Sequence, residues 1–364
     1  MIDFRYHLIS IIAVFLALAI GIVLGTTALN SALLDDLRAN IQGLTQDKED
    51  LRTQVADLQS RVDAAGAFTE STSGLLLADR LAGRDVVVVA APGAPGDVRE
   101  AVLAGVEDAG GRVLGSVLLQ PDYLERDPEE IEELLAELTP TGTPLPEGNA
   151  RNRLAALLAS VLVTSEQAAE EPDSPTEEVL EGLREAGLLR LQGETSGPAE
   201  LVVLVAAPGP GEEVPADEAV VERDRESLVE LALQLRRQAA AAVVAGPDEQ
   251  AGAGGLVDTL RTDAALADQV STVDDAGSPQ GRVGAIYALL DAWRGEVGHY
   301  GRGEGTSGPL PAPLPAGLPP EVTPEVPAGE GGSALGGQPG PWIADGLGPE
   351  RLLLGAAADV ALPR

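Results

Sequence analysis

The sequence contains no cysteine, and aromatic residues account for only 2% of its 364 positions. The absence of cysteine excludes disulfide bonds, thiolate metal sites and cysteine nucleophiles. Histidine occurs only at His7, before the first apolar run, and at His299, beside a Gly/Pro-rich segment, so a histidine-based catalytic centre or multi-histidine metal site is not expected. Methionine occurs only at position 1, which leaves Cu(I) without its preferred sulfur ligands. We therefore expect a protein that is not an enzyme and has no resident cofactor.

Basic residues are also scarce. The chain has 24 Lys and Arg residues against 58 Asp and Glu residues, a formal net charge of -34 at pH 7. Nucleic acids and anionic lipid headgroups both attract basic surfaces, so this charge argues against either as a binding partner. With 44% hydrophobic residues, the chain is still long enough to build a sizeable core.

Residues 8–29 form an uninterrupted apolar run without a charged side chain. At about 1.5 Å per residue, the run can cross a hydrocarbon core of roughly 30 Å. A cleaved signal peptide is the alternative, but the run exceeds the usual roughly 7–15 apolar residues and lacks a clear small-x-small cleavage site. Arg5 precedes the run and Asp35 and Asp36 follow it, which predicts a cytoplasmic N-terminus and an extracytoplasmic remainder. We predict that residues 1–30 are a single-pass anchor in the cell membrane.

Small residues recur every four positions within this run, at Ala13, Ala17, Gly21 and Gly25. They share one helix face, and the last two form a GxxxG pattern that lets two membrane helices pack closely. Small residues are also common in membrane helices that lack this role. We interpret Ala17, Gly21 and Gly25 as dimerisation residues.

A predicted coiled-coil stalk follows at residues 31–68, with apolar residues alternately three and four positions apart. Heptad position a is held by Leu34, Ile41, Lys48, Val55 and Val62, and position d by Leu37, Leu44, Leu51, Leu58 and Ala65. Leucine at d with β-branched residues at a favours a parallel pair, and the single Lys48 at a is a polar insertion of the kind that fixes register. The alternative is one amphipathic helix that folds back on its own domain. We predict a parallel homodimer whose stalk ends at Gly66, Ser71, Ser73 and Gly74.

Residues 82–298 show the alternation typical of an α/β domain. The Val-rich run at 85–92 predicts a buried parallel strand, which a helix ending at 109 and a strand at 112–119 follow. Further strands are predicted at 201–207, 241–245 and 270–273, alternating with helices at 225–238, 255–266 and 281–294. Five strands with interleaved helices predict a doubly wound, flavodoxin-like or Rossmann-like parallel sheet.

Two segments fall outside this alternation. Residues 121–200 are acidic and predict a helical insertion, with helix starts at Asp127-Pro128 and Ser174-Pro175. Its carboxylates could collect cations, but their spacing matches no ligand cluster, so solvated helix faces are the preferred interpretation. Residues 299–364 are Gly/Pro-rich and predict a disordered tail.

The loops at 90–97 and 206–213 follow two predicted strands, where a doubly wound sheet can cradle a phosphate. Neither matches a GxGxxG or Walker sequence, and neither has the lysine that a nucleoside triphosphate usually meets. Turn geometry and helix capping account for both loops without a nucleotide.

Several motifs, taken in order, resemble the actinobacterial MctB copper-transport family over about residues 1–301. They are the opening residues 4–8, the end of the apolar run at 18–25, the coiled coil, the Val-rich strand, and the segments 271–281 and 298–301. The resemblance implies an envelope protein that limits intracellular copper and is proposed to form an outer-membrane channel. Closely similar proteins, called SteB, are described instead as partners of the membrane protein SteA in septation and cell-wall hydrolase control.

The residues of the chain argue against a channel. An outer-membrane barrel needs many alternating strands with aromatic girdles, whereas the strands predicted here are uniformly apolar. A pore built from one spanning helix per chain needs a higher oligomer, and this span has no polar stripe. We therefore expect copper homeostasis, implied by the resemblance alone, to be served by a dimeric scaffold. The alternative is a SteB-like protein that binds a SteA-like partner and transports nothing.

The segment 271–281 offers the best candidate for a site on the surface of the domain. Asp274, Asp275 and Gln280 are its polar candidates. The alternative is that the segment is only a helix entry, with Ser278 as the cap and Pro279 in the first turn.

Overall fold

The computed structural model describes residues 4–164, 176–193, 197–209, 218–247 and 254–318, with the backbone alone for residues 4, 5 and 26–36. The chain divides into two compact units, Met1–Glu321 and Val322–Arg364. All described residues belong to the first unit. The predicted helix start at Ser174-Pro175 lies outside them.

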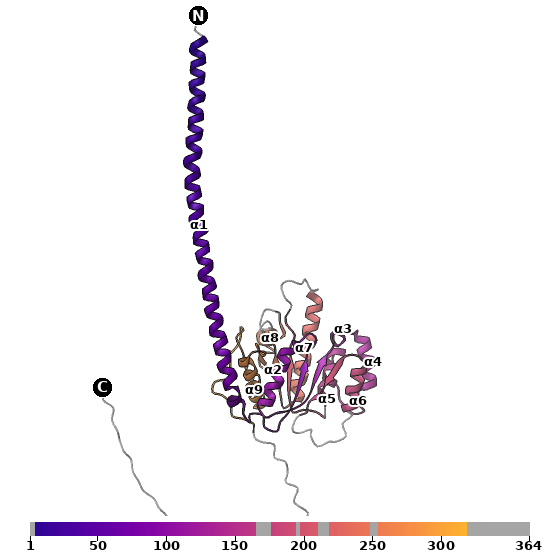
Figure 1. The fold of residues 1–364 in the computed structure, drawn as a ribbon. Helices are drawn as coiled ribbons and strands as arrows, with labels where there is room; N and C mark the ends of the chain where they lie inside the picture. Colours follow the sequence, from indigo (N-terminus) through magenta and orange to yellow (C-terminus); the bar gives the residue numbers. More distant parts are fainter. Residues whose placement is uncertain (1–3, 165–175, 194–196, 210–217, 248–253, 319–364) are drawn as a thin grey trace, which may run out of the picture. The chain divides into compact units, whose positions relative to one another are not determined.

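One helix, α1 (Phe4–Leu77), runs without a break through the predicted anchor and the predicted stalk (Figure 1). The stalk is predicted to end at Gly66, Ser71, Ser73 and Gly74, but these residues do not end the helix, which continues to Leu77. Hydroxyls of Ser71 and Ser73 donate to carbonyl oxygens three residues earlier, at 2.8 and 2.9 Å, and are thus satisfied inside a continuing helix. A helical glycine costs only about 1 kcal/mol relative to alanine, and the full burial of Leu77 against the domain outweighs that cost.

A seven-stranded sheet follows α1 within the described residues. Its strands are β1 (Asp85–Ala90), β2 (Arg112–Leu119), β3 (Leu189–Gln192), β4 (Leu201–Val205), β5 (Ala241–Ala245), β6 (Ser271–Val273) and β7 (His299–Tyr300). The spatial order is β3-β2-β1-β4-β5-β6-β7, and all neighbours are parallel except β2 and β3. The connections reverse direction between β1 and β4, which confirms the predicted doubly wound, Rossmann-like class.

Helices cover both faces of the sheet. On one face lie the end of α1, α2 (Gly96–Asp108) and α9 (Pro279–Trp293), and on the other α5 (Ala150–Leu162), α7 (Glu218–Gln238) and α8 (Leu256–Thr262). The insertion also holds α3 (Asp122–Glu125), α4 (Pro128–Leu138) and α6 (Thr176–Glu185). Along β1, Val86 and Val88 face the first layer while Val87 and Val89 face the second. Both faces of β1 are therefore dry, which explains its unbroken valine run.

The predicted count of five strands misses β3 and β7. β3 lies inside the predicted helical insertion, at an edge of the sheet, where it pairs antiparallel with β2. Its four residues are too few to show a period, and β7 has only two residues. Both strands form because a neighbouring strand supplies their hydrogen-bond partners, which no local pattern reveals.

The folded domain also extends past the predicted boundary at residue 298. The Leu318 side chain is buried in the same core as α9, and its backbone N–H donates to the Arg80 carbonyl at 3.0 Å. The predicted disordered tail is therefore wrong for residues 299–318, while residues 319–364 lie outside the described part of the chain. Backbone hydrogen bonds rather than a periodic apolar face hold this segment in place.

Leu318→Ser is expected to lower the free energy of unfolding by about 3 kcal/mol, because it removes a buried side chain from a packed core. Leu314→Ser is the matched control, since Leu314 is 44% exposed, and its cost should stay below about 1 kcal/mol. Thermal unfolding of the detergent-solubilised chain, followed by circular dichroism, measures both. Equal effects would show that residues 301–318 are not docked.

Candidate functional site

The N-terminal part of α1 has the length and composition of a membrane span. Tyr6–Gly25 covers 20 residues with a mean hydropathy of 2.9, and within the described residues no other helix qualifies. A signal sequence near an N-terminus would have the same properties. A Cβ atom added at Gly21 or Gly25 would meet no atom within 4 Å, so nothing in the packing of the chain itself requires glycine there.

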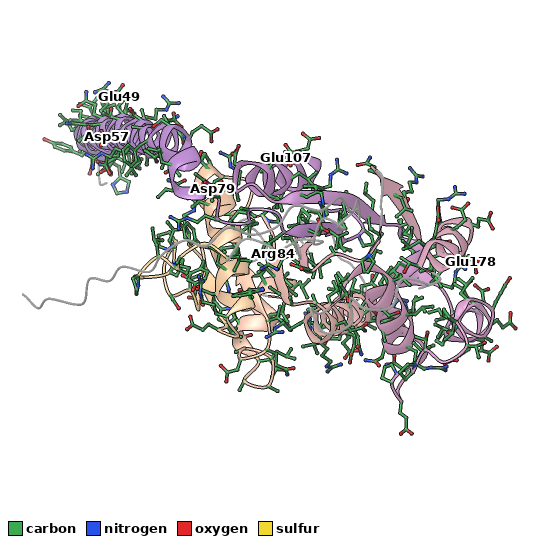
Figure 2. All side chains as sticks on the ribbon, turned by 90° about the horizontal axis from the view of Figure 1, so that it is seen from below. Glu49, Asp57, Asp79, Arg84, Glu107 and Glu178 are labelled. Carbon is green, nitrogen blue, oxygen red and sulfur yellow. The ribbon has the colours of Figure 1, made fainter. Side chains whose placement is uncertain are left out.

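The predicted heptad side chains project into solvent along the middle of α1. Exposed fractions of 53–68% are found for Leu37, Ile41, Leu44, Leu51, Val55, Leu58 and Val62. Lys48 is exposed as well, and the side chain of Leu34 lies outside the described residues. Figure 2 shows Glu49 and Asp57 on this same stretch, which none of the other described elements covers. The helix therefore does not fold back on its own domain. The apolar stripe that these heptad residues form, called the seam below, is open to solvent.

The segment 271–281 is a helix entry. Ser278 caps α9, since its hydroxyl accepts the N–H of Gly281 at 3.0 Å, and Pro279 occupies the first turn. Gly281 is the residue that fits here, because a Cβ atom would lie 1.9 Å from the carbonyl oxygen of Asp275. Gln280 is half-buried in the same first turn. The sequence alternative of helix capping thus describes what this segment does locally.

Asp274 is fully buried, so its assignment to a surface site is wrong. One carboxylate oxygen lies 2.7 Å from Nη1 of Arg261, whose side chain is only 1% exposed, and accepts the N–H of Gly303 at 3.1 Å. The other oxygen accepts the N–H of Arg302 at 2.7 Å. Asp274 lies at the end of β6, where the chain after β7 crosses over it, and this crossing buries the carboxylate. Asp275, in a left-handed conformation at φ 55°, pairs outward with Arg302 at 2.5 Å.

Arg261, on α8, also forms hydrogen bonds to β6 and β7. Its Nε donates to the Thr272 hydroxyl at 2.8 Å, and Nη2 donates to the Tyr300 carbonyl at 2.9 Å. Gly301 lies so close to Asp274 that a Cβ atom would come within 2.1 Å of its carboxylate. The two sequence segments 271–281 and 298–301 are therefore parts of one buried network that ties α8, β6 and β7 together.

His299 extends the network as a neutral ring. The Thr272 hydroxyl, which accepts from Arg261, lies 2.9 Å from Nδ1, and Nε2 lies 3.0 Å from the Ala267 carbonyl, so the proton belongs on Nε2. Burial, followed by the charge of Arg261, lowers the pKa of His299, against the opposing effect of its bond to Ala267 and of Asp268. His299 is thus a structural residue, and the other histidine of the chain, His7, lies before the apolar run and is not near it in sequence.

Tyr300 and Asp291 form a second buried contact that sequence reasoning missed, as it missed Arg261. The Tyr300 hydroxyl donates to the Asp291 carboxylate at 2.6 Å, and burial together with this bond raises the pKa of Tyr300. The available signal was an acidic residue in the apolar stretch that follows Arg282, since Asp291 stands among the buried residues of α9. A buried charge in such a position needs a partner from elsewhere in the fold.

At the switch point between β1 and β4, where doubly wound sheets bind ligands, the described parts of the two loops contact each other. The N–H of Ala91 donates to the Val205 carbonyl at 2.9 Å, and a Cβ atom on Gly93 would touch that of Ala207 at 3.8 Å. A cavity of about 640 Å³ opens elsewhere, between the starts of α5 and α7, and carboxylates and arginines line it together. In the described part of the chain, no group of three or more acidic or histidine side chains converges to hold a metal ion.

Asp274→Asn is expected to lower the free energy of unfolding by about 3–5 kcal/mol, because it leaves the Arg261 guanidinium buried without its counter-charge. Asp275→Asn makes the same chemical change one residue later, in a half-exposed pair, and should cost less than about 1 kcal/mol. Urea unfolding of the two variants gives the comparison. A small, equal loss in both would mean that the Arg261–Asp274 pair is not the anchor of this network.

Known proteins resemble this chain over most of its length. Residues 1–311 match the family described as "Copper transport outer membrane protein, MctB". The chain is 32% identical over 317 residues to "Copper transporter MctB" of Mycobacterium tuberculosis (strain H37Rv), and 30% identical over 327 residues to that of Mycobacterium leprae, covering 84% of this chain and 98% of each relative. A short chain dehydrogenase from Mycobacterium smegmatis aligns over 61% of this chain and 93% of its own, with 15% identity and a TM-score of 0.30. The match of the family over most of the chain confirms the resemblance seen in the sequence, and the chain belongs to the MctB family.

Proposed function

We propose that this chain is a single-pass membrane protein that forms a parallel homodimer and acts as an envelope scaffold in copper homeostasis rather than as a pore or an enzyme. In this proposal α1 supplies both the anchor and the stalk, and the two α/β domains lie outside the cytoplasm. The observation that carries the proposal is the open apolar seam of α1.

The seam stabilises a dimer by burial. Fully burying a leucine or valine side chain contributes about 1.5–3 kcal/mol relative to leaving it in water. Seven such side chains, more than half exposed, lie at heptad spacing between Leu37 and Val62. A second copy of the same helix buries all of them at once, with Leu at d and β-branched residues at three a positions.

The membrane segment supports the same pairing. Gly21 and Gly25 have open space around their Cα atoms, and Ala17 lies one turn earlier on the same face. In lipid, where apolar side chains gain nothing by leaving the solvent, small residues at a helix face allow close backbone contact and thereby favour association.

The orientation rests on charge. Arg5 stands on the N-terminal side of the span, while Asp35 and Asp36 are the first charges after it. Cytoplasmic flanks of membrane helices carry the excess of basic residues, which puts the α/β domain on the opposite side.

The link to copper comes from the relatives, which are named copper transporters. This chain offers Cu(I) no cysteine and one methionine, at position 1, although sulfur ligands are what this ion prefers. These properties favour an indirect part in copper handling, in which the scaffold positions other envelope proteins. A second candidate function, favoured by the same lack of soft ligands, is a SteB-like role in septation through a SteA-like membrane partner, without transport.

Lys48 is the only lysine in the chain and occupies an a position, so it reports the register of the dimer directly. A short amine-reactive crosslinker is expected to join two Lys48 side chains, because an in-register parallel pair brings them together, whereas a slip of one heptad separates them by about 10 Å. Lys48→Arg keeps the charge and should abolish the crosslink. Lys48→Arg with Ser60→Lys moves the amine to the outer face of the helix and is the matched control. Equal yields at positions 48 and 60 would contradict the coiled coil.

Copper flux into liposomes that carry the purified, full-length chain tests the scaffold against a transporter. We expect no flux above protein-free vesicles, since a span with one helix per chain and no polar stripe offers copper no path. Vesicles with Gly21→Ile and Gly25→Ile provide a control in which the helix face is blocked. Copper-selective flux that this double variant abolishes would overturn the scaffold proposal.

A further inference from the structure

The a and d side chains of α1 become less exposed on the C-terminal side of Ala65. Val62, at position a, is 54% exposed, whereas the next a and d residues, Thr69, Thr72 and Leu76, are all half-buried. The cover comes from the same chain, because the last turns of α1 pack on α9 and α2. The seam of α1 is thus open on the N-terminal side of Ala65 and partly covered on its C-terminal side.

The chemistry of the seam changes at the same point. Before Ala65 the d residues are leucines, whereas after it Thr69 occupies position a and Thr72 position d. The hydroxyls of these threonines donate to the carbonyl oxygens of Ala65 and Phe68 at 3.0 and 2.9 Å. Such threonines are satisfied within their own helix and contribute little to a coiled-coil core. The sequence therefore weakens the seam where the domain begins to cover it.

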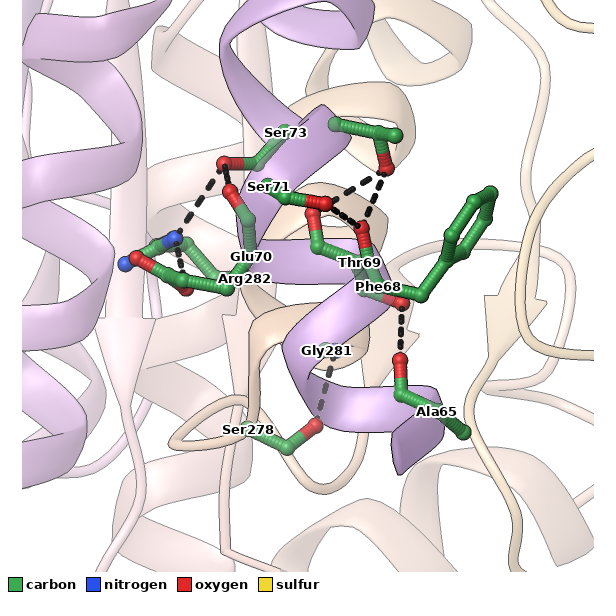
Figure 3. A network of polar contacts seen from close by, with 10 residues as sticks. Ala65, Phe68, Thr69, Glu70, Ser71, Ser73, Ser278, Gly281 and Arg282 are labelled. Carbon is green, nitrogen blue, oxygen red and sulfur yellow. Dashed lines mark hydrogen bonds and ion pairs between the residues drawn. The ribbon is translucent and has the colours of Figure 1, made fainter. Parts of the chain in front are cut away.

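Specific contacts hold α9 in this place. Arg282, in the first turn of α9, lies 2.7 Å from the carboxylate of Glu70 and 3.5 Å from the hydroxyl of Ser73 (Figure 3). One turn further, the Tyr287 hydroxyl donates to the Leu76 carbonyl at 2.9 Å. Ser73, which flanks the seam at heptad position e, is 4% exposed, so this flank of α1 has no room for another helix.

We infer that α9 takes the place of the partner helix along the seam of α1 below Ala65, so that the two α1 helices of the dimer separate between Ala65 and Thr69. The inference rests on the proposed parallel dimer and adds where its contact ends and what replaces it. Packed helices lie about 8–10 Å apart, and a partner continuing down the same seam would occupy the volume that α9 fills.

This separation gives the segment 271–281 a role. Ser278 and Gly281 fix the first turn of α9, and that turn carries Arg282 to Glu70 (Figure 3). The segment is thus a positioning element, which sets the level at which each α1 helix leaves its partner for its own domain.

Single cysteines test the inference, because the chain has none of its own. Val55→Cys, Val62→Cys and Thr69→Cys all occupy position a, and Ser60→Cys on the outer face gives the background. Two cysteines form a disulfide only when their Cα atoms lie within about 7 Å. In the full-length dimer, oxidation with diamide is expected to link the first two variants and to leave Thr69→Cys at the level of Ser60→Cys.

Spin labels provide a second measurement that does not require a buried thiol to react. Arg61→Cys, Phe68→Cys and Leu75→Cys share heptad position g, and the three native side chains are exposed. In a coiled coil that continues to the domain, the distance between paired labels stays constant along this series, whereas separation makes it longest at position 75. Equal distances at positions 61 and 75, or a disulfide at position 69, would overturn the inference and leave the dimer standing. Failure to crosslink at positions 55 and 62 would instead remove the dimer itself.

Discussion

The packing of α1 on α9 is the contact on which the arrangement of anchor and domain depends. Leu77 and Ser73 are buried there, and burial of apolar surface supplies most of the stabilisation. The Arg282–Glu70 pair adds little energy, because Glu70 is 58% exposed and such pairs contribute about 1 kcal/mol or less. Its contribution is geometric, since it fixes the rotation of α1 about its own axis. The direction in which the heptad seam faces follows from that rotation.

The position of α9 depends in turn on the buried Arg261–Asp274 pair. Asp274 follows β6, and four residues later Ser278 caps α9, so the network that holds one end of the loop also aims the helix. A buried ion pair is a poor source of stability, because desolvation offsets most of the attraction, but it permits few alternative arrangements. Both oxygens of Asp274 are occupied, which leaves the end of β6 a single way to pack.

Local patterns in the sequence predict most of this fold. Unbroken valine runs, Gly/Pro loops and proline helix starts identify the parallel strands and their helices, because each depends on neighbours in the chain. The Arg261–Asp274 and Tyr300–Asp291 contacts could not be predicted, since nothing local indicates which distant residue meets a buried charge. The continuation of α1 through Gly66 and Gly74 was missed for the same reason, as docking on α9 overrides a weak helix propensity. Residues 299–318 fold through backbone hydrogen bonds and a few separate side-chain contacts, which form no periodic pattern in the sequence.

The ligands that this chain offers differ from those that Cu(I) prefers. Its 58 carboxylates are hard ligands that suit ions such as Mg²⁺ and Ca²⁺, whereas Cu(I) prefers thiolates and thioethers. In the segments that carry the likeness to the family, Asp274 and Gly301 belong to a buried network, and Gly281 fits the tight entry of α9. That network ties α8, β6 and β7 together, and among the described residues no cluster of acidic or histidine side chains is arranged to hold a metal ion. The described residues of these segments therefore act in packing and in the entry of α9.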